Sequence, residues 1–204
     1  MSESGYFSKY RDSIVRYHEW RNELDIVYKI MLALGFALLT GLMAQIRIVL
    51  PFSPIPITGQ TLAVLLAGVV LGRWGGVSMT MYVGLGIAGV PWFTNWDGGI
   101  ASMTGATGGY LLGFVLAASF VGFMTERYLM SRKTLPLLGI LLFSNFVLIF
   151  LPGLLVLYTW WGEFVGPISL MKLLSIGFIP FIIGDLLKVG VVLGFARSVL
   201  PLKA

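Results

Sequence analysis

Residues 26–50 read IVYKIMLALGFALLTGLMAQIRIVL, and Pro51 follows at once. Almost every side chain in this stretch is apolar. A helix rises about 1.5 Å per residue, so about 20 such residues cross a hydrocarbon core about 30 Å thick. The stretch therefore predicts a transmembrane helix that ends where the proline begins a loop.

The composition of the whole chain agrees with a membrane protein. Of its 204 residues, 57% are hydrophobic and 11% are charged, whereas ordinary soluble domains contain roughly 25% charged residues. The mean hydropathy is +0.91. Residues 1–25 are polar, and the roughly 180 residues after them are enough for about six crossings. We therefore expect an all-α integral membrane protein in which residues 26–204 form one domain of six transmembrane helices.

The breaks between apolar runs place the six spans. Three prolines within residues 51–56 exclude a regular helix there, and residues 91–106 are too polar to cross lipid. Residues 161–177 form a third long connection. We expect three outer loops, and spans at residues 26–50, 61–71, 77–90, 107–124, 135–160 and 178–199.

The basic residues decide the orientation, because cytoplasmic segments of membrane proteins are enriched in Lys and Arg. Of the 14 basic residues, the three long loops carry only Lys172. With a cytoplasmic N-terminus, 11 of the 14 fall on the inner side: Lys9, Arg11, Arg16, Arg21, Lys29, Arg73, Arg127, Arg132, Lys133, Arg197 and Lys203. We therefore expect both termini in the cytoplasm, and the basic charge does not indicate nucleic-acid binding.

Residues 1–25 form a charged extension for which two interpretations stay open. Apolar side chains recur in it at helical spacing, with opposite charges between them. The segment either lies in the membrane interface or is a cytosolic helix that docks on a partner. It has no uninterrupted apolar core, so no cleavable signal peptide is expected.

Asp185 is the only acidic residue well inside a predicted span, and Lys188 follows it on the same helix face. A charge in hydrocarbon costs at least about 2.5–3.5 kcal/mol, so it indicates a functional site by default. The alternative is an ion pair that only neutralises itself. We favour function, because apolar residues can replace an unneeded pair with little loss of stability.

Few side chains suit catalysis or metal binding. The chain has one histidine, His18, and no cysteine, so a transition-metal site is not expected. There is no candidate triad and no intramembrane pair of carboxylates. We expect neither an enzyme nor a bound cofactor.

Three blocks of the sequence resemble a known family. Residues 51–68, PFSPIPITGQTLAVLLAG, are similar to the signature opening of the biotin-specific S components of energy-coupling-factor vitamin transporters, the BioY family. Residues 105–114, GATGGYLLGF, and residues 180–188, PFIIGDLLK, resemble two further blocks in family order. The resemblance covers roughly residues 26–200.

The resemblance implies a substrate-binding subunit in a prokaryotic plasma membrane, with biotin held under the outer loops. It also implies partners: a transmembrane coupling subunit and two ATPase subunits that use ATP. The family's docking surface is implied for a row of small residues on the first span, formed by Ala33, Ala37 and Gly41. Small side chains at this spacing let helices approach closely.

The chemistry of several residues suits biotin, which has a ureido ring, an apolar thiophane ring and a carboxylate. Asp185 is suited to accept the ureido N–H groups, and Lys188 to complement the carboxylate or the ureido oxygen. Aromatic side chains are suited to wall the apolar ring. The candidate binding residues are Asp185, Lys188, Asn95, Gln60, Trp92, Phe93, Trp96 and Tyr110. Which polar group meets which end of biotin stays open.

Three other functions remain as alternatives: an S component for another vitamin, a cation-coupled secondary transporter that uses Asp185, and a membrane scaffold. Secondary transporters usually show paired repeats and paired broken helices. Residues 26–124 and 135–200 show no convincing match to each other, which disfavours that class.

Overall fold

The computed structural model describes residues 23–200, which are mostly helical. The predicted extension over residues 1–25 lies outside these residues except for its last three. The helices are α2 (Ile26–Gln45), α3 (Gln60–Leu71), α4 (Trp74–Ile87), α5 (Ile100–Thr104), α6 (Gly108–Arg127), α7 (Thr134–Phe143), α8 (Phe150–Phe164), α9 (Leu170–Gly177) and α10 (Ile182–Val199). The shorter segments are η1 (Thr94–Trp96), η2 (Leu129–Arg132) and η4 (Ile179–Phe181), which are 3₁₀ turns, and η3 (Ser144–Ile149), which is a π-helix.

Four helical stretches of the described residues are long and apolar enough to cross a membrane: Ile26–Gln45, Gly108–Arg127, Thr134–Phe164 and Leu170–Val199. α3 has 12 residues and α4 has 14, so they are about 18 and 21 Å long, shorter than a hydrocarbon core of about 30 Å. A helical membrane protein is thus confirmed, and the count of six crossings stays a prediction.

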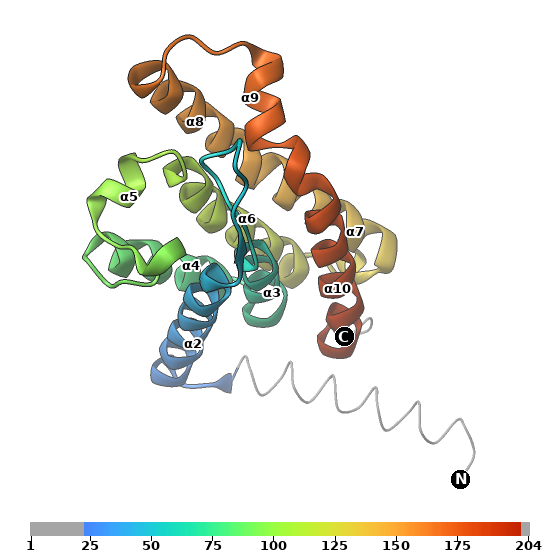
Figure 1. Cartoon of the computed structure of the whole chain (residues 1–204). Helices are drawn as coiled ribbons and strands as arrows, with labels where there is room; N and C mark the ends of the chain where they lie inside the picture. The colour runs from blue at the N-terminus through green and yellow to red at the C-terminus, as the bar shows by residue number, and fades with distance from the viewer. Residues whose placement is uncertain (1–22, 201–204) are drawn as a thin grey trace.

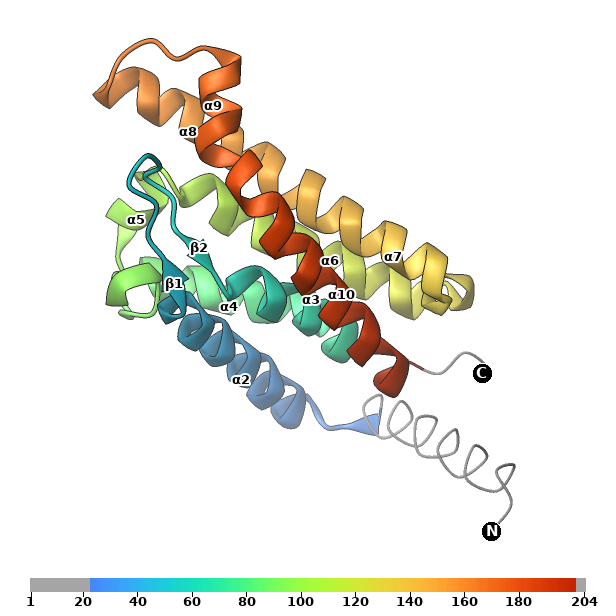
Figure 2. The same cartoon turned by 45° about the vertical axis from the view of Figure 1, so that its right-hand side comes forward.

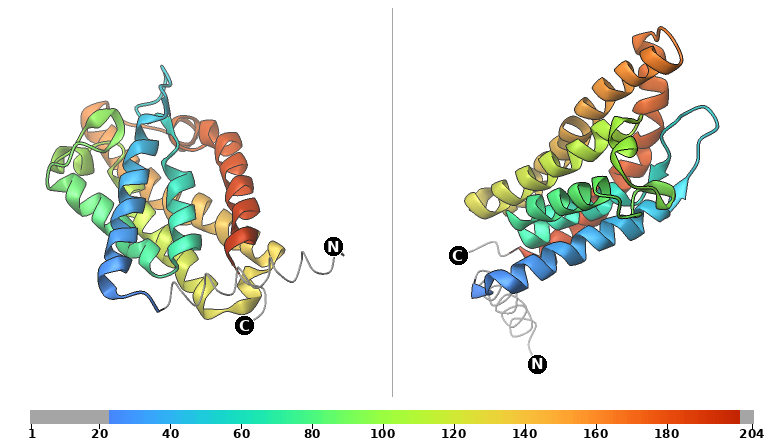
Figure 3. Two further views of the ribbon diagram at one scale, coloured as in Figure 1. Left: turned by 90° about the horizontal axis from the view of Figure 1, so that it is seen from below. Right: turned by 90° about the vertical axis from the view of Figure 1, so that its left-hand side faces the viewer.

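The bundle is built around α3 and α6 (Figure 1). α3 packs against α2, α4, α6 and α10, and α6 also packs against α4 and α8. Figure 3 shows α2, α3 and α10 side by side on one face. Figure 2 shows the β-hairpin, α5 and the α8–α9 connection at one end, and the start of α2 and the end of α10 at the other. We call the first of these the loop end of the bundle.

The first predicted loop, residues 51–60, belongs to a β-hairpin, which corrects the prediction of a purely helical fold. α2 ends at Gln45, before the predicted residue 50, and β1 (Arg47–Ile48) pairs antiparallel with β2 (Ile57–Thr58). The prolines of residues 51–56 lie between the strands, where they remove no hydrogen bond of the ladder. Ser53 Oγ donates a 2.6 Å hydrogen bond to the Ile176 carbonyl and so ties the hairpin to α9.

The predicted connection over residues 161–177 is mostly helical, so its boundaries were wrong. α8 continues to Phe164, and α9 begins after Ser169, whose side chain accepts a 3.3 Å hydrogen bond from the Lys172 N–H as an N-cap. Pro180 then interrupts the helix, because proline has no backbone N–H to donate. The last predicted span, residues 178–199, therefore contains η4 and α10, and α9 precedes it in the longer apolar stretch Leu170–Val199.

The small-residue row Ala33, Ala37 and Gly41 faces the interior and not a partner protein. Ala33 and Ala37 have no exposed surface, and Gly41 is also buried. Ser78 Oγ on α4 donates a 2.6 Å hydrogen bond to the Ala33 carbonyl, and a Cβ on Gly41 would lie 2.9 Å from the Cβ of Trp92. The predicted docking face is therefore corrected to an intramolecular one, where small side chains let α2 approach α4 closely.

We expect Ala37→Trp to destabilise the folded protein, because an indole has no space between α2 and α4. Overpacking typically costs about 1–3 kcal/mol, or a fall in melting temperature of roughly 2–12 °C for a chain of this size. The measurement is a thermal melt of the purified protein in detergent. Gly35→Trp is the matched control, because no atom lies within 4 Å of a Cβ at Gly35. Equal melting temperatures for the two variants would contradict this packing.

Candidate functional site

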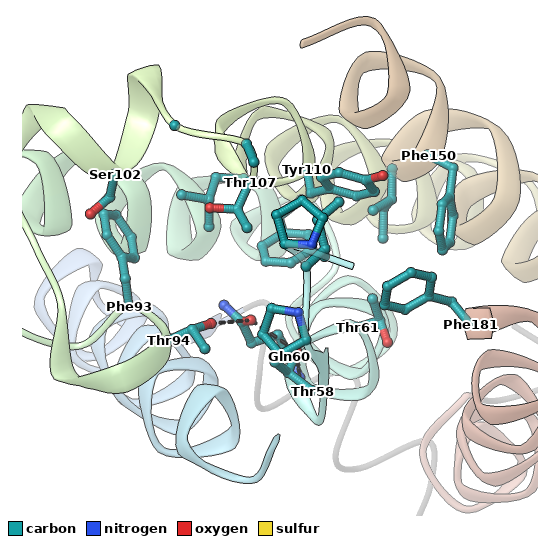
Figure 4. A pocket seen from close by; sticks show the side chains of 18 of the residues that line it. Thr58, Gln60, Thr61, Phe93, Thr94, Ser102, Thr107, Tyr110, Phe150 and Phe181 are labelled. Carbon is teal, nitrogen blue, oxygen red and sulfur yellow. Dashed lines mark hydrogen bonds between the residues drawn. The ribbon is translucent and has the colours of Figure 1, made fainter. Parts of the chain in front are cut away.

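A cavity of about 290 Å³ lies at the loop end of the bundle. This volume is at the lower end of the range for small-molecule sites, roughly 300–1,000 Å³. Its walls come from the hairpin, from α3, α5, α6, α8 and α10, and from the segment that contains η1. Segments from both halves of the chain therefore converge on one site (Figure 4).

Aromatic rings form the apolar wall of the cavity. Figure 4 shows Tyr110, Phe150 and Phe181 grouped together, with Phe93 and Ser102 at the opposite end. Tyr110 and Phe150 meet edge to face with centroids 5.7 Å apart. The Tyr110 hydroxyl donates a 2.8 Å hydrogen bond to the Gly177 carbonyl. This bond uses the single O–H donor of Tyr110, and its ring contributes to the apolar wall of the cavity.

An ion pair between the buried Asp185 and the partly buried Lys188 forms the charged part of the cavity. Lys188 Nζ lies 2.7 Å from Asp185 Oδ1, and Asp185 is 1% exposed. The same ammonium donates to the Thr58 carbonyl at 2.7 Å and to Thr61 Oγ1 at 3.0 Å. These three bonds use all three N–H groups of the lysine. Lys188 therefore holds Asp185 and β2 together, and in this arrangement it has no N–H left for a ligand.

The Asp185 carboxylate is held by donors on both oxygens. Oδ1 accepts hydrogen bonds from Lys188 and, at 3.0 Å, from Thr61 Oγ1; Oδ2 accepts one from Asn145 Nδ2 at 2.9 Å. Asp185 also lies in the first turn of α10, where the helix dipole stabilises a negative charge. A carboxylate oxygen has about two acceptor positions, so Oδ2 can accept one further N–H.

Gln60 lines the cavity, but its amide is engaged by the protein at both ends. Oε1 accepts hydrogen bonds from Thr58 Oγ1 at 2.9 Å and from Thr94 Oγ1 at 3.3 Å, the second of which is drawn in Figure 4. Nε2 donates to the Tyr82 hydroxyl at 2.8 Å. Gln60 thus joins α3, β2 and η1 beside the cavity.

Five of the eight predicted binding residues line the cavity: Asp185, Lys188, Gln60, Phe93 and Tyr110. Trp92 is buried in the core, where its Nε1 donates a 2.9 Å hydrogen bond to the Tyr82 carbonyl. Asn95 Oδ1 accepts a 2.7 Å hydrogen bond from Arg47 Nη2 and so links η1 to the hairpin. Trp96 is 62% exposed. These last three do not line the cavity.

Two residues beside Asp185 were missed from the sequence, Thr61 and Asn145. Asn145 is the only side-chain amide within residues 135–160, an otherwise apolar run. Thr61 directly follows Gln60, and no periodicity marks it out. For metals, the described residues contain no group of three or more His, Cys, Asp or Glu side chains that could hold an ion.

The family model and two known proteins that are similar to this chain all carry the name BioY. The BioY family model matches residues 15–204, so it begins inside the predicted extension. A probable biotin transporter BioY of Methanothermobacter thermautotrophicus is 46% identical over 141 residues, which are 67% of this chain and 88% of that protein. The biotin transporter BioY of Thermotoga maritima is 34% identical over 143 residues, 68% of this chain and 77% of that protein.

A solved structure shares the fold. The crystal structure of the S-component for biotin from an ECF-type ABC transporter has a TM-score of 0.73 to this chain and covers 84% of it, and 89% of that structure is matched. The sequence identity is 24%, so this likeness shows the fold alone. The family model and the relatives above 30% identity go further, and on their strength this chain belongs to the BioY family.

Proposed function

We propose that this chain is a membrane subunit that binds biotin for uptake into a prokaryotic cell. The observation that carries the proposal is the cavity of about 290 Å³, which combines aromatic walls with one buried carboxylate, in a chain whose relatives are named biotin transporters. The likeness to an S-component for biotin supports the same function.

The hydrogen-bond capacity of the site suits the ureido ring of biotin. The ureido group offers two N–H donors, and Asp185 Oδ2 has capacity for one more donor beyond Asn145. The cluster of Tyr110, Phe150 and Phe181 is suited to cover the apolar rings. Lys188 balances the charge of Asp185, so that a neutral ureido ring can bind there without leaving an unpaired buried charge.

The proposed assembly and topology follow from the family and from the charges. The partners are a transmembrane coupling subunit and two ATPase subunits, which use ATP. The chain crosses the plasma membrane six times with both termini in the cytoplasm, as the distribution of Lys and Arg favours. The start of α2 and the end of α10 lie at the same end of the bundle, which supports an even number of crossings (Figure 2).

Equilibrium binding of labelled biotin to the purified chain in detergent tests the function directly. Saturable binding that unlabelled biotin displaces is the expected result. Binding of another vitamin in place of biotin would assign the chain to a different substrate. No binding of any vitamin, together with cation-driven flux in proteoliposomes, would identify a secondary transporter.

We expect Asp185→Asn to weaken biotin binding roughly 10- to 100-fold. The substitution keeps the size of the side chain but removes its charge, and a hydrogen bond to a charged group contributes about 1.5–3 kcal/mol. The measurement is the dissociation constant for labelled biotin, with a melting temperature recorded for each variant without ligand.

The double variant Asp185→Leu/Lys188→Leu separates binding from simple charge neutralisation. If the pair only neutralises itself, two leucines restore a stable protein that binds biotin normally. If Asp185 binds the ligand, the double variant folds but loses biotin affinity. A folded double variant with native affinity would show that these two residues are scaffold.

The topology predicts which sites an impermeant thiol reagent reaches in intact cells. The chain has no native cysteine, so single cysteines can be introduced without background labelling. We expect Glu163→Cys to react in intact cells, and Met130→Cys, which replaces a side chain that is 63% exposed, to react only after permeabilisation. The opposite pattern would reverse the orientation.

A further inference from the structure

Asn145 is a fully buried amide inside Thr134–Phe164, the most hydrophobic of the four candidate membrane spans in the described residues. Its Nδ2 donates a 2.9 Å hydrogen bond to Asp185 Oδ2, and among the described residues it is the only donor to that oxygen. The orientation of the amide follows from chemistry, because the opposite orientation would set two acceptors against each other. Asn145 thus contacts the carboxylate of Asp185, which binds the ligand in the proposed function.

The backbone around Asn145 departs from a regular helix. Residues Ser144–Ile149 form a π-helix between α7 and α8. Pro152 follows one turn later and has no N–H to donate back along the helix. π-helical turns are rare and occur frequently at functional sites.

The packing of α6 accommodates this irregular turn. Gly113 lies so close to it that a Cβ there would be 2.6 Å from the Ile149 Cα. A glycine at this position therefore lets η3 lie directly against α6. The site of Asn145 is thus a built feature of the fold, in which two helices are adapted to each other.

The side-chain oxygen of Asn145 lowers the stability of the fold, which is unexpected for a residue with only a packing role. Within the described part of the chain, Asn145 Oδ1 has no hydrogen-bond partner, although it is buried. Buried polar atoms are normally paired, and an unpaired one lowers stability. A leucine would fill nearly the same volume in an apolar helix without this cost. Packing alone therefore does not explain an asparagine here, and its hydrogen bond to Asp185 Oδ2 is what a leucine could not replace.

We propose that Asn145 is a positioning residue for ligand binding, which holds Asp185 Oδ2 in the orientation that receives the ligand N–H. Asn145 is absent from the residues that line the cavity, so it acts through Asp185. Thr61 and Lys188 hold the other oxygen, Oδ1. With both oxygens held, the carboxylate is preorganised before the ligand enters. This inference rests on the proposed function, because it needs Asp185 to bind biotin.

Two variants with opposite packing consequences test the proposal. Asn145→Leu fills the space of the amide, and Asn145→Ala leaves it empty, but both remove the donor to Asp185. We expect each to weaken biotin binding about tenfold, the lower end for a hydrogen bond to a charged group. The matched control is Ser144→Ala, because Ser144 is equally buried but its Oγ donates only to the Ile140 carbonyl of its own helix. Its dissociation constant should stay within about twofold of wild type.

A double-mutant cycle distinguishes a positioning role from a merely structural one. It compares the effect of Asn145→Leu on biotin affinity in wild type and in the Asp185→Asn background. If Asn145 acts through Asp185, the effect of Asn145→Leu should shrink to about threefold or less in the Asp185→Asn background, because a neutral amide accepts a weaker hydrogen bond. An equal loss in both backgrounds overturns the positioning role. So does a failure of both Asn145 variants to fold without ligand, because Asn145 is then scaffold.

The same data separate this inference from the proposed function. If wild type binds biotin and Asp185→Asn weakens binding, but Asn145→Leu and Asn145→Ala bind like wild type, the positioning role alone is wrong. If wild type does not bind biotin, the proposed function is wrong and the positioning role is overturned with it.

Discussion

The ion pair between the buried Asp185 and the partly buried Lys188 is the interaction on which the geometry of the cavity depends. Through it, α10 is joined to β2 at the Thr58 carbonyl, to α3 at Thr61 and to the π-helical turn at Asn145. A charged pair in a low-dielectric interior is tolerated only when its hydrogen bonds are satisfied. The four segments are therefore held in one arrangement, and the polar part of the cavity is formed before a ligand arrives.

Interruptions of regular helix bring these four segments together at the cavity. Pro180 ends the helical run from α9, so that Asp185 lies in the first turn of a new helix, where the dipole favours its charge. The π-helical turn brings Asn145 to the same carboxylate, and the prolines of residues 51–56 shape the hairpin tip that lines the cavity. Irregular backbone at membrane depth is tolerated where it is buried in protein or lines a cavity. The irregular segments of this chain meet at the cavity.

The helices were predictable from the sequence, but the direction in which their faces point was not. The row Ala33, Ala37 and Gly41 was expected to face a partner and instead packs α2 on α4. In a soluble helix the polar face identifies the exposed side, whereas in lipid both faces are apolar. Small residues at a spacing of four indicate a close helix contact without indicating whether that contact is internal or with another protein.

By itself, the sequence determined the membrane class, most helix positions, the family and the placing of Asp185 and Lys188 on one helix face. These properties depend on hydrophobicity, charge and spacing along a single segment. The tertiary structure alone decided which residues line the cavity: Tyr110 lines it, and Trp96 does not. It also brought Asn145 to Asp185 across 40 residues of sequence. Such contacts depend on how helices rotate and pack against each other, which no local pattern records.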